Sequence, residues 1–105
     1  MIKDFKYNIT PFGCFISEYN GTDKIVIVPE KIAGCEVREI STSAFAANKL
    51  IEKVVLPEGL DFIGSYAFAG CENLKTLILP ETLRKISYNV VLDCKSLKKI
   101  QFNHK

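Results

Sequence analysis

The segment Lys53–Leu60, KVVLPEGL, recurs 23 residues later as Thr76–Leu83, TLILPETL. An earlier copy, IVIVPE at residues 25–30, lies 28 residues upstream of residues 53–58, and five residues are inserted between its proline and Ile40. The 23-residue spacing also links Phe45 to Phe68, Ile63 to Ile86, Cys71 to Cys94 and Leu74 to Leu97. A fixed period of this length indicates a repeat architecture.

A unit of this length cannot bury an apolar face alone, but stacked units bury a continuous core, as in a solenoid. The apolar run before each proline alternates with period two, which predicts a strand, and the proline ends it because it has no N–H to donate. Every copy runs the same way round the coil, so these strands must be parallel. After the turn we predict a second short strand near Asp61–Gly64 and a helical turn over Ser65–Cys71, with Lys85–Leu92 as the corresponding stretch of the last copy.

The repeated residues resemble the BspA-like class of leucine-rich repeats, whose unit runs approximately L-x-x-I-x-L-P-x-x-L-x-x-I-G-x-x-A-F-x-x-C. The resemblance extends over about residues 15 to 102. The matching positions are Leu56-Pro57, Leu60, Ile63-Gly64 and Ala67-Phe68-Ala69-Gly70-Cys71. The sequence departs from the pattern where Asn48 takes the cysteine position of the first copy and where Val90-Val91 replaces Ala-Phe in the last.

This resemblance implies a leucine-rich-repeat solenoid that is β-rich, with short parallel strands, turns and short helical segments. It also implies a bacterial, adhesive, non-catalytic module that binds a protein or a glycan through its strand face. The first residues, Met1–Lys6, lack the apolar core of a signal peptide, whereas the resemblance implies a cell-surface or secreted location.

Residues 1–19 do not repeat, and they predict a β-hairpin. Phe5, Tyr7 and Ile9 alternate with polar residues, residues 10–13 offer a Thr-Pro-Phe-Gly turn, and the segment around Phe15 can pair back. Solenoids need atypical ends that cover the first rung. We therefore predict one folded unit, in which residues 1–23 form an N-terminal capping hairpin and residues 24–105 form about three rungs and a final strand.

Composition narrows the class of partner. The chain is 48% hydrophobic and 25% charged, with a net charge of +2, as in ordinary globular domains. So small a charge does not favour nucleic acid or an anionic membrane. The last third is nevertheless basic, with Lys75, Arg84, Lys85, Lys95, Lys98, Lys99 and Lys105. No segment approaches the about 18 apolar residues of a membrane helix, so we expect no membrane insertion.

The sequence contains no set of residues that is typical of a catalytic or cofactor-binding site. The single histidine, His104, is one residue from the end of the chain. No G-x-x-x-x-G-K-[ST] or G-x-G-x-x-G motif occurs, so we expect no phosphate or dinucleotide site, no cofactor and no enzyme activity. Gly59, Gly64 and Gly70 are expected to serve as turn residues.

Four cysteines lack the Cys-x-x-Cys spacing of zinc sites, so no zinc is expected: Cys14, Cys35, Cys71 and Cys94. Cys71 and Cys94 occupy equivalent positions, so their Cα atoms should lie about 5 Å apart, which permits a disulfide. Stacked side chains point the same way, however, and we therefore expect free thiols.

Three glutamates, Glu30, Glu58 and Glu81, each follow a proline, and stacked rungs would hold them about 5 Å apart. A cation could bridge such a ladder. A solvated turn is the favoured interpretation, because no second set of oxygen ligands is visible for the six- to eightfold shell of calcium.

The outward positions of the strands give the candidate partner-binding residues. Since Val54 and Leu56 point inward, the alternation places two columns outward. One is Ile27, Val55, Ile78 and Gln101, and its neighbour is Ile25, Lys53, Thr76 and Lys99. A stripe of exposed apolar residues suits a contact site, but β-branched residues suit strands whatever they face, so both interpretations stand. We expect Ile78→Glu to leave folding intact and Leu77→Glu to unfold the protein or cause aggregation.

A second function remains open, in which the chain is a structural or assembly fragment. No cap is visible after the last strand around Lys98–Phe102, and an open strand edge recruits other strands. Lys98, Lys99 and Lys105 would guard this edge, whereas Ile100 and Phe102 would expose part of the core. This alternative predicts a weak homodimer through the C-terminal edge.

Overall fold

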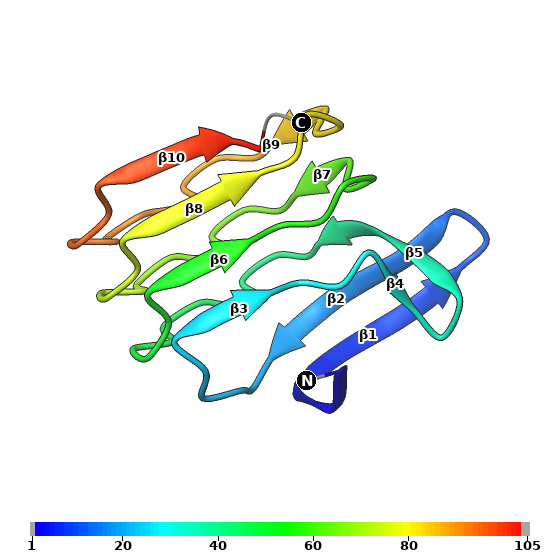
Figure 1. The fold of residues 1–105 in the computed structure, drawn as a ribbon, viewed down its shortest axis with the longest axis horizontal. Helices are drawn as coiled ribbons and strands as arrows, with labels where there is room; N and C mark the ends of the chain where they lie inside the picture. Colours follow the sequence, from blue (N-terminus) through cyan, green and yellow to red (C-terminus); the bar gives the residue numbers. More distant parts are fainter. Residues whose placement is uncertain (1, 104–105) are drawn as a thin grey trace.

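The computed structural model describes residues 2–103 as a β-solenoid with two layers of strands (Figure 1). The first layer has the order β10-β8-β6-β3 and contains β3 (Ile25–Ile27), β6 (Lys53–Val55), β8 (Thr76–Leu79) and β10 (Lys99–Phe102). The second has the order β1-β2-β5-β7-β9 and contains β1 (Phe5–Thr10), β2 (Gly13–Tyr19), β5 (Cys35–Ile40), β7 (Phe62–Ile63) and β9 (Lys85–Ile86). β4 (Lys31–Ile32) pairs with β5, and a 3-10 helix, η1 (Ile2–Asp4), precedes β1. No helix within residues 2–103 is long and apolar enough to cross a bilayer.

The predicted parallel stacking of the strands before each proline is confirmed. Val54 pairs with Val26 on one side and with Leu77 on the other, and all three side chains are buried. The ladder continues beyond the strand, since the Leu56 N–H donates to the Ile78 carbonyl at 2.9 Å. Because a slip of one residue would turn every buried side chain outward, the apolar alternation fixes this register.

The second predicted strand is confirmed as β7, but the helical turn predicted over Ser65–Cys71 is wrong. Alternate N–H groups in this stretch donate to the next rung, as Phe68 does to the Val90 carbonyl at 2.9 Å. The others close tight turns within the rung, as Ala69 does to the Tyr66 carbonyl at 3.0 Å. An α-helix would direct its N–H groups along its own axis and leave none for the neighbouring rung.

Left-handed backbone at two repeated positions makes this alternation possible. Tyr66 and Gly70 have φ angles of 59° and 73°. The equivalent residues also have positive φ: Ser43 and Asn89 for the first position, Ala47 and Asp93 for the second. Gly70 is therefore a turn residue, as predicted, and so is Gly59, with a φ of 97°.

Gly64 is needed for close approach of two rungs, rather than for a turn. A Cβ atom at this position would lie 2.7 Å from the Thr42 nitrogen and 3.0 Å from the Ser41 carbonyl carbon. The Gly64 N–H donates to the Ile40 carbonyl at 2.8 Å, which holds the two backbones together.

We expect Gly64→Ala to reduce the free energy of unfolding by about 2 kcal/mol, because the backbone must move to admit a methyl group. Urea unfolding followed by circular dichroism measures the change. Ser87→Ala is the matched control, since position 87 is equivalent in the next rung and already carries a Cβ; it should cost no more than about 1 kcal/mol. Equal, small losses for the two variants would contradict the close-approach role.

The five residues inserted in the first copy form a hairpin, in which β4 and β5 pair antiparallel. Ala33 and Gly34 at its turn have φ angles of 52° and 78°, and two positive φ values are what a type I′ turn requires. Ile40 then pairs with Ile63 in the regular register. The insertion is thus absorbed locally, without disturbing the next rung.

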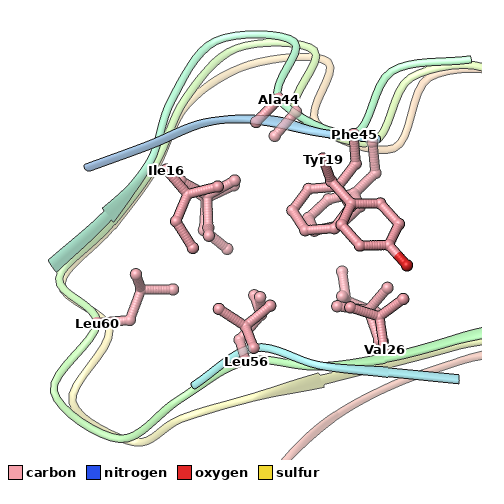
Figure 2. Packing of buried hydrophobic residues seen from close by; sticks show 14 of the residues in the cluster. Ile16, Tyr19, Val26, Ala44, Phe45, Leu56 and Leu60 are labelled. Atoms are coloured by element: carbon pink, nitrogen blue, oxygen red, sulfur yellow. The ribbon is translucent and has the colours of Figure 1, made fainter. Parts of the chain in front are cut away.

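An aromatic column runs through one side of the core (Figure 2). Phe45 stacks on Phe68 with ring centroids 4.8 Å apart and on Tyr19 at 5.1 Å, and the rings of Phe5 and Tyr19 are 5.0 Å apart. Phe5 and Tyr19 belong to the β1–β2 hairpin, and β2 pairs in parallel with β5. The hairpin therefore caps the first rung by extending both the sheet and the aromatic column.

Candidate binding face

The outward side of the sheet β3-β6-β8-β10, called the strand face below, carries the candidate residues in two straight rows. The register places Ile27, Val55, Ile78 and Gln101 in one row. It places Ile25, Lys53, Thr76 and Lys99 in the other. The structure thus brings together residues up to 74 positions apart in the chain, because the strands pair without a shift between neighbours.

Exposure along the apolar row is uneven, and this corrects one expectation. Ile27 is 70% exposed and Val55 is half-buried, whereas Ile78 is only 8% exposed. β8 has a strand on each side, while β3 lies at the edge of the sheet, so neighbouring side chains cover Ile78 but leave Ile27 open. Ile78→Glu should therefore destabilise the protein, contrary to the expectation that it leaves folding intact.

The strand face carries two cations that form no ion pair with a carboxylate of the described residues. Lys53 and Lys99 are exposed, and neither has an ion-pair partner within residues 2–103. Thr76 lies between them in the row and is half-buried. An apolar row beside a row with unpaired ammonium groups can contact both apolar and anionic groups of a partner.

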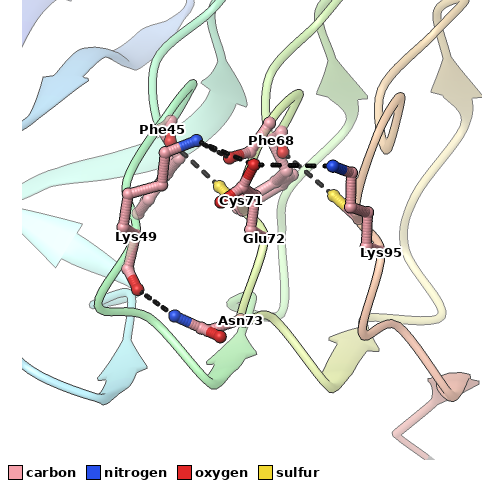
Figure 3. Close-up of polar contacts among 9 residues, drawn as sticks. Phe45, Lys49, Phe68, Cys71, Glu72, Asn73 and Lys95 are labelled. Carbon is pink, nitrogen blue, oxygen red and sulfur yellow. Dashed lines mark hydrogen bonds and ion pairs between the residues drawn. The ribbon is translucent and has the colours of Figure 1, made fainter.

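Ion pairs beside the face repeat with the rungs, a feature that the sequence reasoning missed. Lys49, Glu72 and Lys95 occupy equivalent positions, and the Glu72 carboxylate lies 3.6 Å from Lys49 Nζ and 3.9 Å from Lys95 Nζ (Figure 3). Glu52 and Lys75 form a similar pair at 3.5 Å. The signal was present in the sequence, since opposite charges recur 23 residues apart. Exposed pairs of this kind contribute about 0–1 kcal/mol each, so they favour the register without dominating stability.

The cysteines at the repeated position are free thiols, each bonded to the preceding rung. Cys71 Sγ donates to the Phe45 carbonyl and Cys94 Sγ to the Phe68 carbonyl, both at 3.1 Å (Figure 3). Asn48, which replaces cysteine in the first copy, donates through Nδ2 to the Gly21 carbonyl at 3.3 Å. The position therefore serves as an inter-rung hydrogen-bond donor, whichever residue occupies it.

Burial raises the pKa of the Cys71 thiol from 9.0 to about 11. At pH 8 this lowers the thiolate fraction about 100-fold. We expect iodoacetamide to leave Cys71 unmodified in the folded protein and to alkylate all four cysteines in denaturant without reductant. A mass two protons low together with a cross-linked Cys71–Cys94 peptide would contradict free thiols.

The same pKa shift predicts an alkaline loss of stability. A thiol with a raised pKa in the folded state favours folding while it stays protonated, so its contribution is complete below about pH 9 and is lost as the pH rises through about 11. Cys71→Ser keeps a donor that does not titrate in this range. Its melting temperature should therefore fall less than that of the parent between pH 9 and 11.

The other candidate groups that the structure describes are not brought together into a metal site. Glu30, Glu58 and Glu81 follow the prolines, and within residues 2–103 no group of three or more His, Cys, Asp or Glu side chains is placed to hold a metal ion. His104 lies outside the described residues. A surface pocket of about 270 Å³ lies between the 10–13 turn and the start of β5. Its arginine, Arg38, is already held by Glu36 at 2.8 Å and by the Gly59 carbonyl at 3.0 Å.

Comparison with known proteins agrees with this architecture. Residues 34–105 match the family model described as the BspA type leucine-rich repeat region (6 copies). The structure is similar to a leucine-rich repeat protein of T. pallidum, with a TM-score of 0.92 and 36% identity over 95% of this chain and 48% of that one. It is also similar to a leucine-rich cell surface protein of Faecalibacterium prausnitzii A2-165, with a TM-score of 0.83 and 21% identity over 94% of this chain and 31% of that one. A leucine-rich-repeat protein of Bacteroides capillosus ATCC 29799 has a TM-score of 0.71 and 14% identity, over 99% of this chain and 97% of that one.

A comparison with curated proteins finds no match. The chain spans about half the length of the T. pallidum protein. Leucine-rich-repeat proteins are generally binding modules without enzymatic activity, and this fold suggests a protein-interaction module. With more than two thirds of its residues matching the family model and the same repeat-by-repeat architecture, the chain belongs to the BspA-type leucine-rich-repeat family.

Proposed function

We propose that the protein is a non-catalytic interaction module that binds a protein or a glycan through its strand face. The observation that carries the proposal is the pairing of four parallel strands without a shift. It places an apolar row beside a row with two lysines that have no ion-pair partner among residues 2–103. Repeat solenoids commonly use such extended surfaces for binding.

The exposure pattern supports contact at the β3 end of the face. Ile25 and Ile27 are both largely exposed, and they lie beside Lys53 and Val55 on β6. Burial of these apolar side chains against a partner would favour binding by about 25 cal/mol per Å² of apolar surface removed from water. Lys53 would also fix the orientation of the partner, because an anionic group on the partner can pair with this lysine in only one docked position.

We further propose a cell-surface or secreted location, where an adhesive module meets its partners. The support is the BspA type of the repeats and the similarity to a protein that is itself described as a cell surface protein. Surface labelling of intact cells with a membrane-impermeant biotin reagent tests this location. Recovery of the protein only after lysis would contradict it.

A binding screen with matched charge changes tests the proposed face. The immobilised protein is offered to arrays of purified extracellular proteins and of glycans, and each hit is measured again with Lys53→Glu and with Lys31→Glu. Both variants reverse one exposed lysine, but Lys31 lies on β4, away from the strand face. A partner of the face should bind Lys53→Glu at least about tenfold more weakly and Lys31→Glu as tightly as the parent. Equal binding by both variants would move the site away from the strand face.

A further inference from the structure

The two lysines of the strand face lie two strands apart in one straight row, called the lysine row below. Lys53 is on β6 and Lys99 on β10, and Thr76 on β8 occupies the same row between them (Figure 1). Neighbouring strands are about 4.8 Å apart, so the Cα atoms of the two lysines are about 9.6 Å apart. The ladder of parallel strands therefore fixes the spacing of two positive charges.

The apolar row runs alongside the lysine row. Each of its residues follows a residue of the lysine row by two positions in the same strand, as Val55 follows Lys53, which corresponds to about 6.6 Å along the strand. Ile27 is 70% exposed and Val55 is half-buried. Both rows cross the strands along the axis of the solenoid. A linear partner that lies along this axis would thus meet positive charge on one side and apolar surface on the other.

The charge of the strand face favours an anionic partner. Neither row contains an acidic residue. Lys53 and Lys99 form no ion pair with a carboxylate of residues 2–103. A second copy that met this face with its own strand face would bring lysines but no carboxylate, and like charges that face each other oppose association. A different chain with carboxylates at the right spacing would gain from both lysines.

The spacing of the lysines favours one backbone conformation of the partner. A polyproline II helix has three residues per turn and rises about 3.1 Å per residue, so side chains on one of its ridges are about 9.3 Å apart. Side chains on one face of a strand are about 6.7 Å apart. Two turns of an α-helix span about 10.8 Å. The polyproline II repeat therefore matches the distance across two strands most closely.

We propose that the strand face binds a proline-rich segment of another protein, in polyproline II conformation, that carries a carboxylate at every third residue. The segment lies across the strands along the solenoid axis. Its acidic ridge pairs with Lys53 and Lys99, and a second ridge places apolar side chains on Ile27 and Val55. This inference rests on the proposed function, because it names the partner of the same face.

The backbone of such a segment suits this face as well. A polyproline II helix makes no internal hydrogen bonds, so its carbonyl groups are free to accept. The Thr76 hydroxyl, between the two lysines, can donate to one of them. Because proline holds this conformation before binding, the segment loses little conformational entropy when it docks.

Fluorescence anisotropy with labelled peptides and the full-length protein tests the proposal. The first probe is a peptide of four Glu-Pro-Val repeats. The second has four Lys-Pro-Val repeats, and the third has the composition of the first but with its glutamates together at one end. The parent should bind the first peptide at least about tenfold more tightly than either of the others. Binding should weaken as salt rises, because exposed charges are screened.

Lysine variants make the result specific to the face. Lys53→Gln and Lys99→Gln should each weaken binding of the first peptide about fivefold, and the double variant about 25-fold. Lys31→Gln is the matched control, since it removes one exposed lysine from β4. It should bind this peptide within about twofold of the parent.

The proposal is overturned if the first and third peptides bind alike, if the double variant binds the first peptide as the parent does, or if no peptide binds at millimolar concentration. It is likewise overturned if dextran sulfate binds the parent more tightly than the first peptide does and loses affinity in the double variant. The occupant of the face would then be an anionic glycan.

Failure of the proposed function itself gives a different result. Partners from the array screen would then bind Lys53→Glu as tightly as the parent. If those partners bind Lys53→Glu more weakly while no peptide binds the parent, the strand face remains the binding surface, and only the polyproline II partner is wrong.

Discussion

Leu77→Glu should abolish cooperative folding. Leu77 is buried between Val54 and Ile100 in successive strands. A carboxylate placed there would lose its water without gaining a partner, at a cost of several kcal/mol. Total stability of a domain is only about 5–15 kcal/mol. Circular dichroism and thermal melting should show unfolded or aggregated protein.

Ile27→Glu is the matched control for Leu77→Glu. Its side chain points outward at the edge of the same sheet, so the free energy of unfolding should change by no more than about 0.5 kcal/mol. If Leu77→Glu folds and Ile27→Glu does not, the strand register is wrong by one residue.

Phe68→Ala should lower the free energy of unfolding by about 3–5 kcal/mol. Phe68 is fully buried and stacks on Phe45, so its removal interrupts the aromatic column that joins the rungs to the cap. Urea titration gives the change in midpoint and shows from the slope whether unfolding stays cooperative.

Val91→Ala is the natural comparison for Phe68→Ala. Val91 occupies the equivalent position of the last rung, where it is smaller and only partly buried. Its truncation should cost about 1 kcal/mol. If Phe68→Ala costs no more than Val91→Ala, the aromatic column is not what stabilises the stack.

Much of the fold could be predicted from the sequence, because a buried apolar position recurs with the repeat and leaves a visible period. The strands before each proline, their parallel order and the inward direction of Val54 and Leu56 all follow from that period. The shape of Ser65–Cys71 did not follow from it. This stretch depends on positive φ values, and although Gly70, Asn89 and Asp93 are typical of such positions, Tyr66 is not.

The sequence predicted which residues of the strands point outward on the candidate face, but not how exposed each side chain is. Alternation alone states which side of a sheet a residue faces. It does not state how far the neighbours cover that residue, and Ile78 shows the difference, because it points outward yet is buried. The expected exposure of Ile100 and Phe102 is confirmed, since these side chains are 50% and 46% exposed.

A lysine-labelling footprint of the protein with a captured partner shows whether the strand face is the binding surface. Acetylation followed by mass spectrometry is compared in the free and bound states. We expect Lys53 and Lys99, which are 46 residues apart in sequence but lie in one row of the face, to become protected together. Lys6 on β1 and Lys31 on β4 should react as before. Protection of Lys6 or Lys31, with Lys53 and Lys99 unchanged, would contradict this expectation.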